Sequence, residues 1–410
     1  MPRHHRITLY RSKLRDAPID LTYAEETLRR SQKRFRNRRV LTPAIDLDAY
    51  QWGAVVDWID IEFELIRRTQ HWKLNDRIEA RTGRKEFPEA LDLGAGKTAT
   101  QYRLRVQEPD FAIVRKVMED IEAEYGLTAP ARVVGLEVSI DAYPRTAGEE
   151  ARARLHGVLV RHFFPTTAVL TGDKKWPRFV PGMIDDTDHI VGRNKEDVTL
   201  DVIDRMTPST DRPVLYASTF YVGEKADKRA LWRIQNKVLD KQNKAAGTRE
   251  VLPEDRKRIR IEVALGPDGC REAGLQSFET IGDFKFTRLQ KLYFQFVKPT
   301  FGVFPHGGAG AHISAVRRQA EETRRQRFLN AGVLGLQIRE DAREELRRLE
   351  MASFTSWHKS RGSKMPRKIR TGAGPYGSMV AYEELARIVE RALSGLQKRV
   401  RREMVRVGVR

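Results

Sequence analysis

The sequence contains a single cysteine, Cys270, and no long uninterrupted apolar stretch. One cysteine cannot build an internal disulfide framework or a cysteine-based zinc site. No apolar run approaches the ~20 residues that a membrane-spanning helix requires. The basic N-terminus also lacks the apolar core of a signal peptide. These absences predict a protein of the reducing cytoplasm that does not interact with a membrane.

Positive charge is plentiful but concentrated at the two ends of the chain. The 410 residues include 76 Lys and Arg against 56 Asp and Glu, a net charge of +20. Residues 1–52 carry a net charge of +6 and residues 313–410 a net charge of +12, which leaves the stretch between them nearly neutral. No segment pairs this charge with a strongly apolar helix face, so nucleic acid is a better partner than an anionic membrane.

Apolar periodicity divides the chain into strands and helices. The hydrophobic content of 40% excludes a wholly disordered chain. Alternating residues predict strands over 54–66, 98–107, 132–142, 214–223 and 257–265. Helical spacing predicts helices over 22–39, 109–125, 147–163, 226–243, 277–298, 313–329, 337–350 and 379–404, with loops across 166–212.

This order of elements predicts an α+β fold with a central, mainly antiparallel sheet and flanking helices. Together with the charge distribution it predicts three parts. Residues 1–52 would form a basic helical arm, and residues 53–312 the α+β domain. Residues 313–410 would form a basic helical C-terminal region with a linker near 357–378.

Carboxylates on the predicted strands are the main candidates for chemistry. Glu137 and Asp141 are four residues apart on one strand, so they point to the same face. Glu262 lies on another strand, and Asp57 and Asp60 lie on the first. Charged residues often do no more than line a half-exposed sheet face. If carboxylates of three strands converge, however, their hard oxygen ligands suit Mg²⁺ or Mn²⁺, which can polarise a phosphodiester for attack.

Four short segments occur in an order that carries a family resemblance. They are VVDWIDIEFEL, VVGLEVSID, STFYVGEKADKRALWRIQNK and RIRIEVAL, all within residues 54–300. The series resembles the rolling-circle replication initiation factors of plasmids and filamentous phages, and the related relaxases of conjugative elements. In that family a strand with Asp and a strand with two spaced acidic residues come first. A block with Gly-Ser-Arg and Tyr-x-Lys and then a strand with Arg-x-Glu follow.

The resemblance implies a DNA-nicking enzyme of a bacterial plasmid, phage or integrated element. It would act at a replication or transfer origin, bind the origin as duplex and single strand, and have a host helicase as a further partner. Glu137, Asp141 and Glu262 would hold Mg²⁺ or Mn²⁺. The residues expected to bind DNA are Lys225, Lys228, Arg229, Arg233, Arg258 and Arg260.

The nucleophilic tyrosine is the point at which this chain departs from the family. Residues 235–237 read Gln-Asn-Lys in place of Tyr-x-Lys, and residues 223–225 read Gly-Glu-Lys in place of Gly-Ser-Arg. Nicking by this route needs a tyrosine, because a covalent phosphotyrosine keeps the energy of the broken bond. Tyr221 is the preferred catalytic candidate, together with Lys237, which matches the family's lysine. Tyr216 and Tyr293 are the other nearby tyrosines.

Two other functions remain open. A non-catalytic DNA-binding protein of a mobile element would keep the fold without the nucleophile, and Gln235 favours this alternative. The retained carboxylates favour the enzyme. An RNA-binding protein built on a sheet platform would need exposed aromatic residues on its central strands, where this chain offers carboxylates instead.

Overall fold

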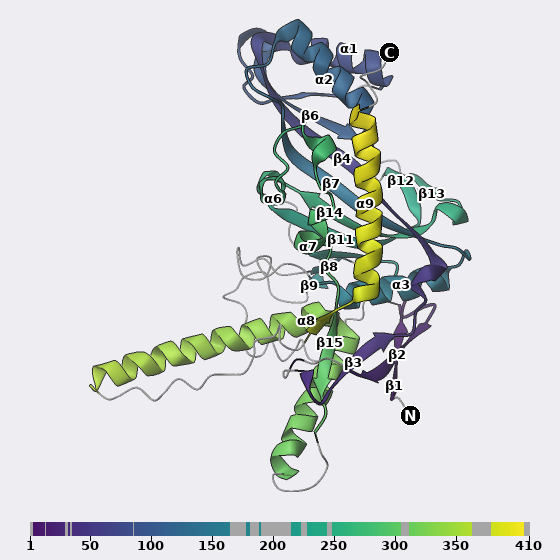
Figure 1. Ribbon diagram of the computed structural model, residues 1–410, viewed down its shortest axis with the longest axis vertical. Helices are drawn as coiled ribbons and strands as arrows, with labels where there is room; N and C mark the ends of the chain where they lie inside the picture. Colours follow the sequence, from purple (N-terminus) through teal and green to yellow (C-terminus); the bar gives the residue numbers. More distant parts are fainter. Residues whose placement is uncertain are drawn as a thin grey trace. The chain divides into compact units, whose positions relative to one another are not determined.

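Two compact units share the chain in alternating segments. In the computed structural model the first unit comprises Met1–Leu47, Thr146–Val222 and Gln295–Ala386, and the second comprises Asp48–Arg145, Gly223–Phe294 and Arg387–Arg410. The described residues are 3–12, 14–28, 32, 35–84, 86–164, 178–180, 188–189, 215–222, 228–243, 248–304, 311–362 and 379–405 (Figure 1). The three parts expected from the charge distribution stay a prediction, because the two units are defined by spatial proximity and not by charge.

The first unit is built on an antiparallel sheet with the strand order β1-β2-β3-β15-β16. The strands are β1 (His4–Leu9), β2 (Ile19–Thr27), β3 (Arg38–Pro43), β15 (Val297–Gly302) and β16 (Met379–Ala381). Helices α3 (Glu149–His162) and α8 (Ala311–Ser360) pack together and contact this sheet. The remaining short strands are β8 (Arg178–Val180), β9 (Asp188–His189) and β10 (Thr219–Val222).

A buried histidine joins α3 to the sheet of the first unit. The Nδ1 atom of His162 lies 2.8 Å from the carbonyl oxygen of Val297 on β15. Its ring also contacts the rings of Tyr23, Phe328 and Tyr382. Burial lowers the pKa of His162 to about 3, so the ring is neutral at physiological pH and packs as an aromatic residue.

The predicted helix over 22–39 is wrong, because residues 22–27 belong to strand β2 and residues 38–39 to strand β3. Along β2 the side chains of Leu21, Tyr23 and Glu25 are buried in alternation, which is the strand period. The buried Glu25 carboxylate is paired with Arg39 at 2.8 Å and with Arg325 at 2.9 Å. Glu25 therefore takes part in a cross-strand ion pair with β3 and a helix-to-strand ion pair with α8.

The helices predicted over 313–329 and 337–350 both fall within α8. A glycine between them, Gly332, has the positive φ of 70° and interrupts the helical backbone. A Cβ atom at this position would lie 2.6 Å from the Cα atom of Arg161. Glycine is needed here both for the left-handed conformation and for the close approach to α3.

The second unit contains the strand order β5-β6-β4-β7-β14-β11, with all neighbouring strands antiparallel. The strands are β4 (Tyr50–Gln70), β5 (Glu89–Ala90), β6 (Thr98–Gln107), β7 (Arg132–Pro144), β11 (Ala230–Lys237) and β14 (Arg258–Leu265), with a separate hairpin of β12 (Leu239–Asn243) and β13 (Thr248–Val251). The protein is therefore α+β with antiparallel sheets, as predicted. The strands expected over 54–66, 98–107, 132–142 and 257–265 are confirmed.

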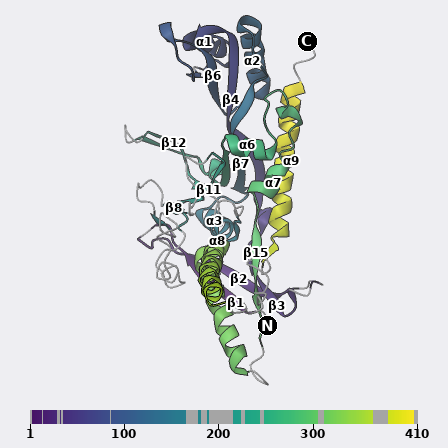
Figure 2. The same ribbon diagram turned by 90° about the vertical axis from the view of Figure 1, so that its left-hand side faces the viewer.

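Helices of the second unit cover one face of this sheet. They are α1 (His71–Thr82), α2 (Phe111–Tyr125), α6 (Pro267–Ala273), α7 (Arg288–Tyr293) and α9 (Glu383–Val405), the last belonging to this unit from Arg387 onward. Figure 2 shows α6, α7 and α9 on the same side of the strands. The strand residues that face them are apolar and buried, among them Val138, Ile140, Ile261, Val263, Trp232 and Ile234.

Local signals explain the helix limits that the sequence predicts correctly. Asp110 caps α2 by accepting hydrogen bonds from the backbone N–H groups of Ala112 and Ile113. Gly126, with a φ of 70°, follows its last turn. The predicted seam of α9, which includes Val389, Leu393, Leu396 and Val400, is buried.

Three further sequence predictions need correction. The described residues of the basic helix expected over 226–243 form strands β11 and β12, because buried Trp232 and Ile234 alternate with less buried neighbours and continue the sheet. The helix expected over 277–298 is a short 3-10 turn (Ile281–Asp283), α7 and the start of β15. The strand expected over 214–223 is confined to β10. Most of the predicted 166–212 loop and 363–378 of the predicted linker lie outside the described residues.

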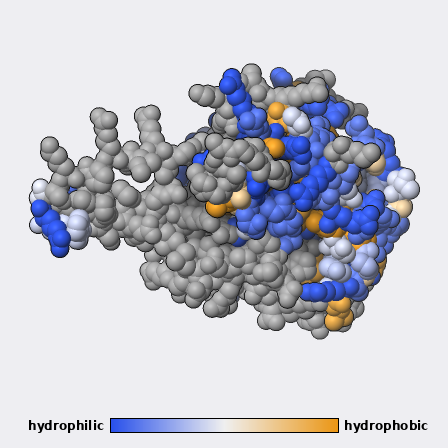
Figure 3. Space-filling model, turned by 90° about the horizontal axis from the view of Figure 1, so that it is seen from below, coloured by the Kyte–Doolittle hydropathy of each residue, from blue (hydrophilic) through white to orange (hydrophobic). Residues whose placement is uncertain are grey.

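Hydrophilic residues cover most of the described surface in the view of Figure 3. Among the described residues, no helix carries an apolar stretch long enough to cross a lipid bilayer.

Trp232 is expected to be a major contributor to the stability of the second unit. It is 1% exposed, and its indole N–H donates to the carbonyl oxygen of Tyr293 at 2.8 Å. Trp232→Ala should lower the free energy of unfolding by roughly 3–5 kcal/mol, measured by urea denaturation. Trp72→Ala, at a tryptophan that is 40% exposed, is the matched control and should cost less than ~1 kcal/mol. Equal losses from the two variants would contradict this packing.

Candidate functional site

The uncovered face of the second unit's sheet is lined by charged side chains. Alternation along β7, β14 and β11, and an irregularity in β4, place residues from four neighbouring strands on this face, which we call the charged face. The charged face includes Asp57 on β4, Glu137, Ser139, Asp141 and Tyr143 on β7, Arg258, Arg260 and Glu262 on β14, and Arg233, Gln235 and Lys237 on β11. The register makes them neighbours, since Glu262 lies opposite both Ser139 and Arg233.

Three carboxylates converge at the centre of the charged face. Asp57, Glu137 and Glu262 each place one oxygen within 4.8 Å of the other two. Glu137 and Glu262 are buried, with 6% and 4% exposure, and Asp57 is half-buried. The structure thus brings together two of the three predicted metal ligands and adds Asp57 in place of Asp141.

A β-bulge directs Asp57 onto this face. The register of β4 against β7 shifts between Val56 and Trp58, so β4 holds one residue more than its partner at this point. Asp57 and Trp58 consequently point to the same side of the sheet. Alternation alone does not reveal this, and for that reason the sequence places Asp57 on the strand without assigning it to the site.

Arginines neutralise the buried carboxylates. Arg233 contacts Glu137, and its Nε atom lies 2.6 Å from the Oε2 atom of Glu262. Arg260 contacts Asp57 at 2.8 Å, and the Oγ atom of Ser139 also donates to Asp57. Such pairs are required because an unpaired buried carboxylate would lose its hydration without compensation.

Asp141 is held in a separate arginine clamp. Arg260 donates to its two oxygens at 2.6 and 2.7 Å, and Arg258 lies 3.1 Å away. Asp141 therefore shares a face with Glu137, as the spacing predicts, but is not part of the converging triad.

The electrostatic environment shifts the pKa values of several groups on the charged face, among them Glu262, Glu137 and Lys237. Burial raises the pKa of Glu262 to about 7, and the neighbouring Glu137 acts in the same direction against the lowering effect of Arg233. Burial also raises the pKa of Glu137. The pKa of Lys237 is lowered, first by burial and then by the positive charges of Arg260 and Arg258. Proton exchange near neutral pH is therefore possible at this face.

The carboxylate triad has the donor chemistry of a magnesium or manganese site. Two oxygens that share one octahedral ion lie at most roughly 4.2 Å apart, because each bond is about 2.1 Å long. The oxygens of Asp57, Glu137 and Glu262 all lie within 4.8 Å of one another, which is close to this separation. Arg233 contacts two of the three carboxylates, so a cation would have to displace it. The residues fit a divalent ion once this arginine moves.

The residues predicted to bind DNA divide into three groups. Arg233, Arg258 and Arg260 lie on the charged face. Lys228 is exposed just before β11, and Arg229 forms a bidentate pair with Glu272 at 2.7 Å. Lys225 lies outside the described residues.

The tyrosine candidates occupy different surroundings. Tyr221 lies on β10 in the first unit, half-buried. Tyr216 is buried there with its hydroxyl donating to Ala17. Tyr293 is buried in the second unit, where burial and Glu272 raise the pKa of its hydroxyl. The charged face itself carries Tyr143, which no sequence motif singled out and whose hydroxyl lies 3.5 Å from Asp141.

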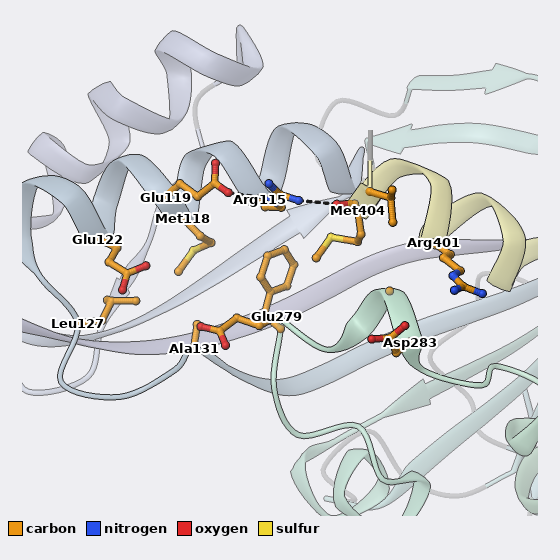
Figure 4. Close-up of a pocket in the computed structure, with 13 residues that line it drawn as sticks. Arg115, Met118, Glu119, Glu122, Leu127, Ala131, Glu279, Asp283, Arg401 and Met404 are labelled. Atoms are coloured by element: carbon orange, nitrogen blue, oxygen red, sulfur yellow. Dashed lines mark hydrogen bonds and ion pairs between the residues drawn. The ribbon is translucent and has the colours of Figure 1, made fainter. Parts of the chain in front are cut away.

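A pocket of about 420 Å³ elsewhere in the second unit has a different character (Figure 4). Its lining combines the apolar Met118 and Met404 with acidic residues that outnumber the arginines. Arg115 joins α2 to α9 across it by donating to the carbonyl oxygen of Met404. Its acidic lining would repel phosphate, so this pocket is no candidate for nucleic acid.

Comparisons with known proteins give no match: neither protein-family models nor curated proteins show significant similarity to this chain.

The ionisation of Glu262 is expected to make stability fall with rising pH. Its pKa is about 7 in the folded protein against 4.5 for an ordinary glutamate, so the folded state holds the proton more tightly. This contribution is complete below pH 4.5 and is lost as the pH rises to about 7. Glu262→Gln remains neutral throughout. The free energy of unfolding of this variant, relative to that of the wild type, should therefore rise by up to about 1.4 kcal/mol per pH unit across this range.

The measurement is urea denaturation of both proteins between pH 4 and 8. Glu390→Gln, at an exposed position of α9, is the control because it removes one carboxylate outside the charged face. A constant difference between wild type and Glu262→Gln at every pH would contradict the raised pKa.

Arg233 is expected to stabilise the second unit mainly because its positive charge reduces the repulsion between the carboxylates of Glu137 and Glu262. Arg233→Met removes the nearest cation of Glu137 and Glu262, leaves Glu262 with the more distant Arg260 at 3.8 Å, and should cost roughly 3–5 kcal/mol of unfolding free energy. Adding Glu262→Gln should restore part of the loss in a double-mutant cycle. Arg229→Met, which breaks the more exposed pair with Glu272, should cost about 1 kcal/mol or less. The interpretation fails if the double variant is no more stable than Arg233→Met.

Proposed function

We propose that this protein binds DNA and cleaves one strand with a divalent metal at the charged face, in the manner of replication initiators and relaxases. The observation that carries the proposal is the convergence of Asp57, Glu137 and Glu262 within 4.8 Å on a sheet face that also holds three arginines and a lysine. Carboxylates supply the ligands for Mg²⁺ or Mn²⁺, and arginines supply the partners for phosphate.

In this proposal the arginines of the charged face connect DNA binding with metal binding. A guanidinium group pairs in the same bidentate way with a carboxylate and with a phosphate. An incoming phosphodiester therefore competes with Glu137 and Glu262 for Arg233. The carboxylates released in this exchange become available to a cation, so strand binding and metal binding would favour each other.

The main residues of the charged face would then have separate roles. Asp57, Glu137 and Glu262 would hold the ion, which polarises a phosphodiester oxygen when bound. Arg260 keeps Asp57 and Asp141 in place through its three hydrogen bonds. Lys237, with its lowered pKa, releases a proton more readily than an ordinary lysine and can contact the phosphate or accept a proton.

A second candidate is a non-catalytic DNA-binding protein that keeps the fold. The closed pairing of every carboxylate of the triad with an arginine favours it. So does Gln235, which donates to Glu262 at 2.9 Å from a position where the related family carries its tyrosine. In both cases the protein would belong to a bacterial plasmid, phage or integrated element, act in the cytoplasm and work with a host helicase.

Metal binding separates the two candidates. The full-length protein is titrated with Mn²⁺ by calorimetry, with and without single-stranded DNA. Asp57→Asn, Glu137→Gln and Glu262→Gln should each weaken Mn²⁺ binding at least ~10-fold, since even indirect partners of a metal are worth that much. Asp60→Asn is the matched control, because Asp60 pairs with Arg105 on the same sheet outside the triad. Absence of Mn²⁺ binding alongside salt-sensitive DNA binding would leave the non-catalytic candidate.

Cleavage is tested in the same samples. Single-stranded and supercoiled origin DNA with Mn²⁺ should yield a covalent protein–DNA adduct that survives denaturation. Tyr221→Phe and Tyr143→Phe identify which hydroxyl forms the phosphotyrosine, since one of them should abolish the adduct. An adduct that persists in both variants would exclude these two tyrosines.

A further inference from the structure

A groove of about 780 Å³ runs between α9 and the first residues of β4 in the second unit. Its floor is formed by residues 50–54 of β4, at a point where β6 no longer pairs with that strand. Its wall is formed by α9, which contributes the buried Ile388, Ala392 and Leu396 together with arginines at the edge of the buried seam. This groove is separate from the charged face, whose residues do not line it.

Arginines dominate the lining of this groove. On α9, Arg391, Arg399 and Arg402 follow one another at spacings that place them along one helix face. Arg145, from the end of β7, faces them across the groove, and Asp48 is the one acidic residue of the lining. Neither Arg391 nor Arg402 has an ion-pair partner among the described residues. The charge is therefore available to an anionic ligand.

The groove also offers an aromatic surface and open space. Trp52 is partly exposed in the lining, and its ring lies 6.3 Å from the ring of Tyr50. Gly395 interrupts the arginine stripe of α9, and a Cβ atom there would meet no atom within 4 Å. A glycine in the middle of a helix costs up to ~1 kcal/mol relative to alanine. Here it leaves the groove open where a larger side chain would fill it.

We propose that this groove binds a single-stranded nucleic acid, with Arg391, Arg399 and Arg402 on its phosphates and Trp52 stacked on a base. A positively charged groove with an aromatic side chain is the arrangement that binds single strands without sequence preference. Stacking on Trp52 requires a base that is not already stacked inside a duplex, which favours a single strand. The inference rests on the proposed function, to which it adds a second binding surface that holds the strand away from the carboxylates.

The test measures binding of fluorescein-labelled oligo(dT) to the full-length protein by anisotropy at several salt concentrations, without metal. The variant Arg391→Gln/Arg402→Gln should bind more weakly. The slope of log K against log salt should become shallower by about 1.4, because each phosphate that an arginine neutralises adds ~0.7 to it. Trp52→Ala should weaken binding about 10-fold. Lys398→Gln/Arg401→Gln is the matched control, since it removes the same charge from exposed positions of α9 outside the groove.

Gly395 provides a second, independent readout. Gly395→Glu places bulk and negative charge in the groove and should reduce oligo(dT) binding strongly. Gly395→Ala adds one methyl group into open space and should leave binding unchanged. Because both substitutions fall at one exposed helix position, a general folding defect would affect them alike.

Two results would overturn the inference. One is an equal loss of affinity in the groove variant and the control variant, which would indicate that only overall charge matters. The other is competition in which duplex DNA displaces oligo(dT) more effectively than an unlabelled single strand does. Mn²⁺-dependent cleavage by the wild type is scored separately, so failure of the groove and failure of the proposed function remain distinguishable.

Discussion

The second unit depends on the need to neutralise carboxylates that its sheet removes from water. Glu137, Asp141 and Glu262 are nearly fully buried, and a buried carboxylate without a partner costs several kcal/mol. Their partners, Arg233 and Arg260, come from neighbouring strands at positions that the antiparallel register fixes. A shift of one residue would turn these groups to the apolar face, where α6, α7 and α9 pack. Charge pairing and helix packing thus specify the same register.

Much of this unit is predictable from the sequence because the relevant signals are local. Alternation identifies four of its main strands, and it correctly places Glu137 beside Asp141 and Glu262 beside Arg260 on common faces. The failures arise where charge obscures the period. Residues 22–39 and 226–243 contain many Arg and Lys, which a helix tolerates equally well, and only pairing with other strands decides the outcome. Which carboxylates meet could not be predicted, because it depends on strand order and on an irregularity at Asp57.

The proposed function gives the arginines of the charged face a double use. In the free protein they hold a buried acidic cluster together, and with DNA bound they would transfer part of their pairing to phosphate. The groove beside α9 differs in this respect, because Arg391 and Arg402 are paired with no carboxylate in the part of the chain that the structure describes. One surface would therefore bind a strand through an exchange of partners, and the other through attraction alone. The two should respond differently to salt and to divalent ions.

The bulge at Asp57 has a consequence for how this chain can change by insertion and deletion. A deletion elsewhere in a paired strand reverses the facing of every residue on one side of it. Deletion of Asp57 instead removes the extra residue of this bulge, and the residues before and after it keep the faces they already have. Loss of this one codon would thus change the cluster from three carboxylates to two without changing the core of the sheet. A single in-frame deletion at this position would therefore remove one of the three proposed metal ligands and leave the fold in place.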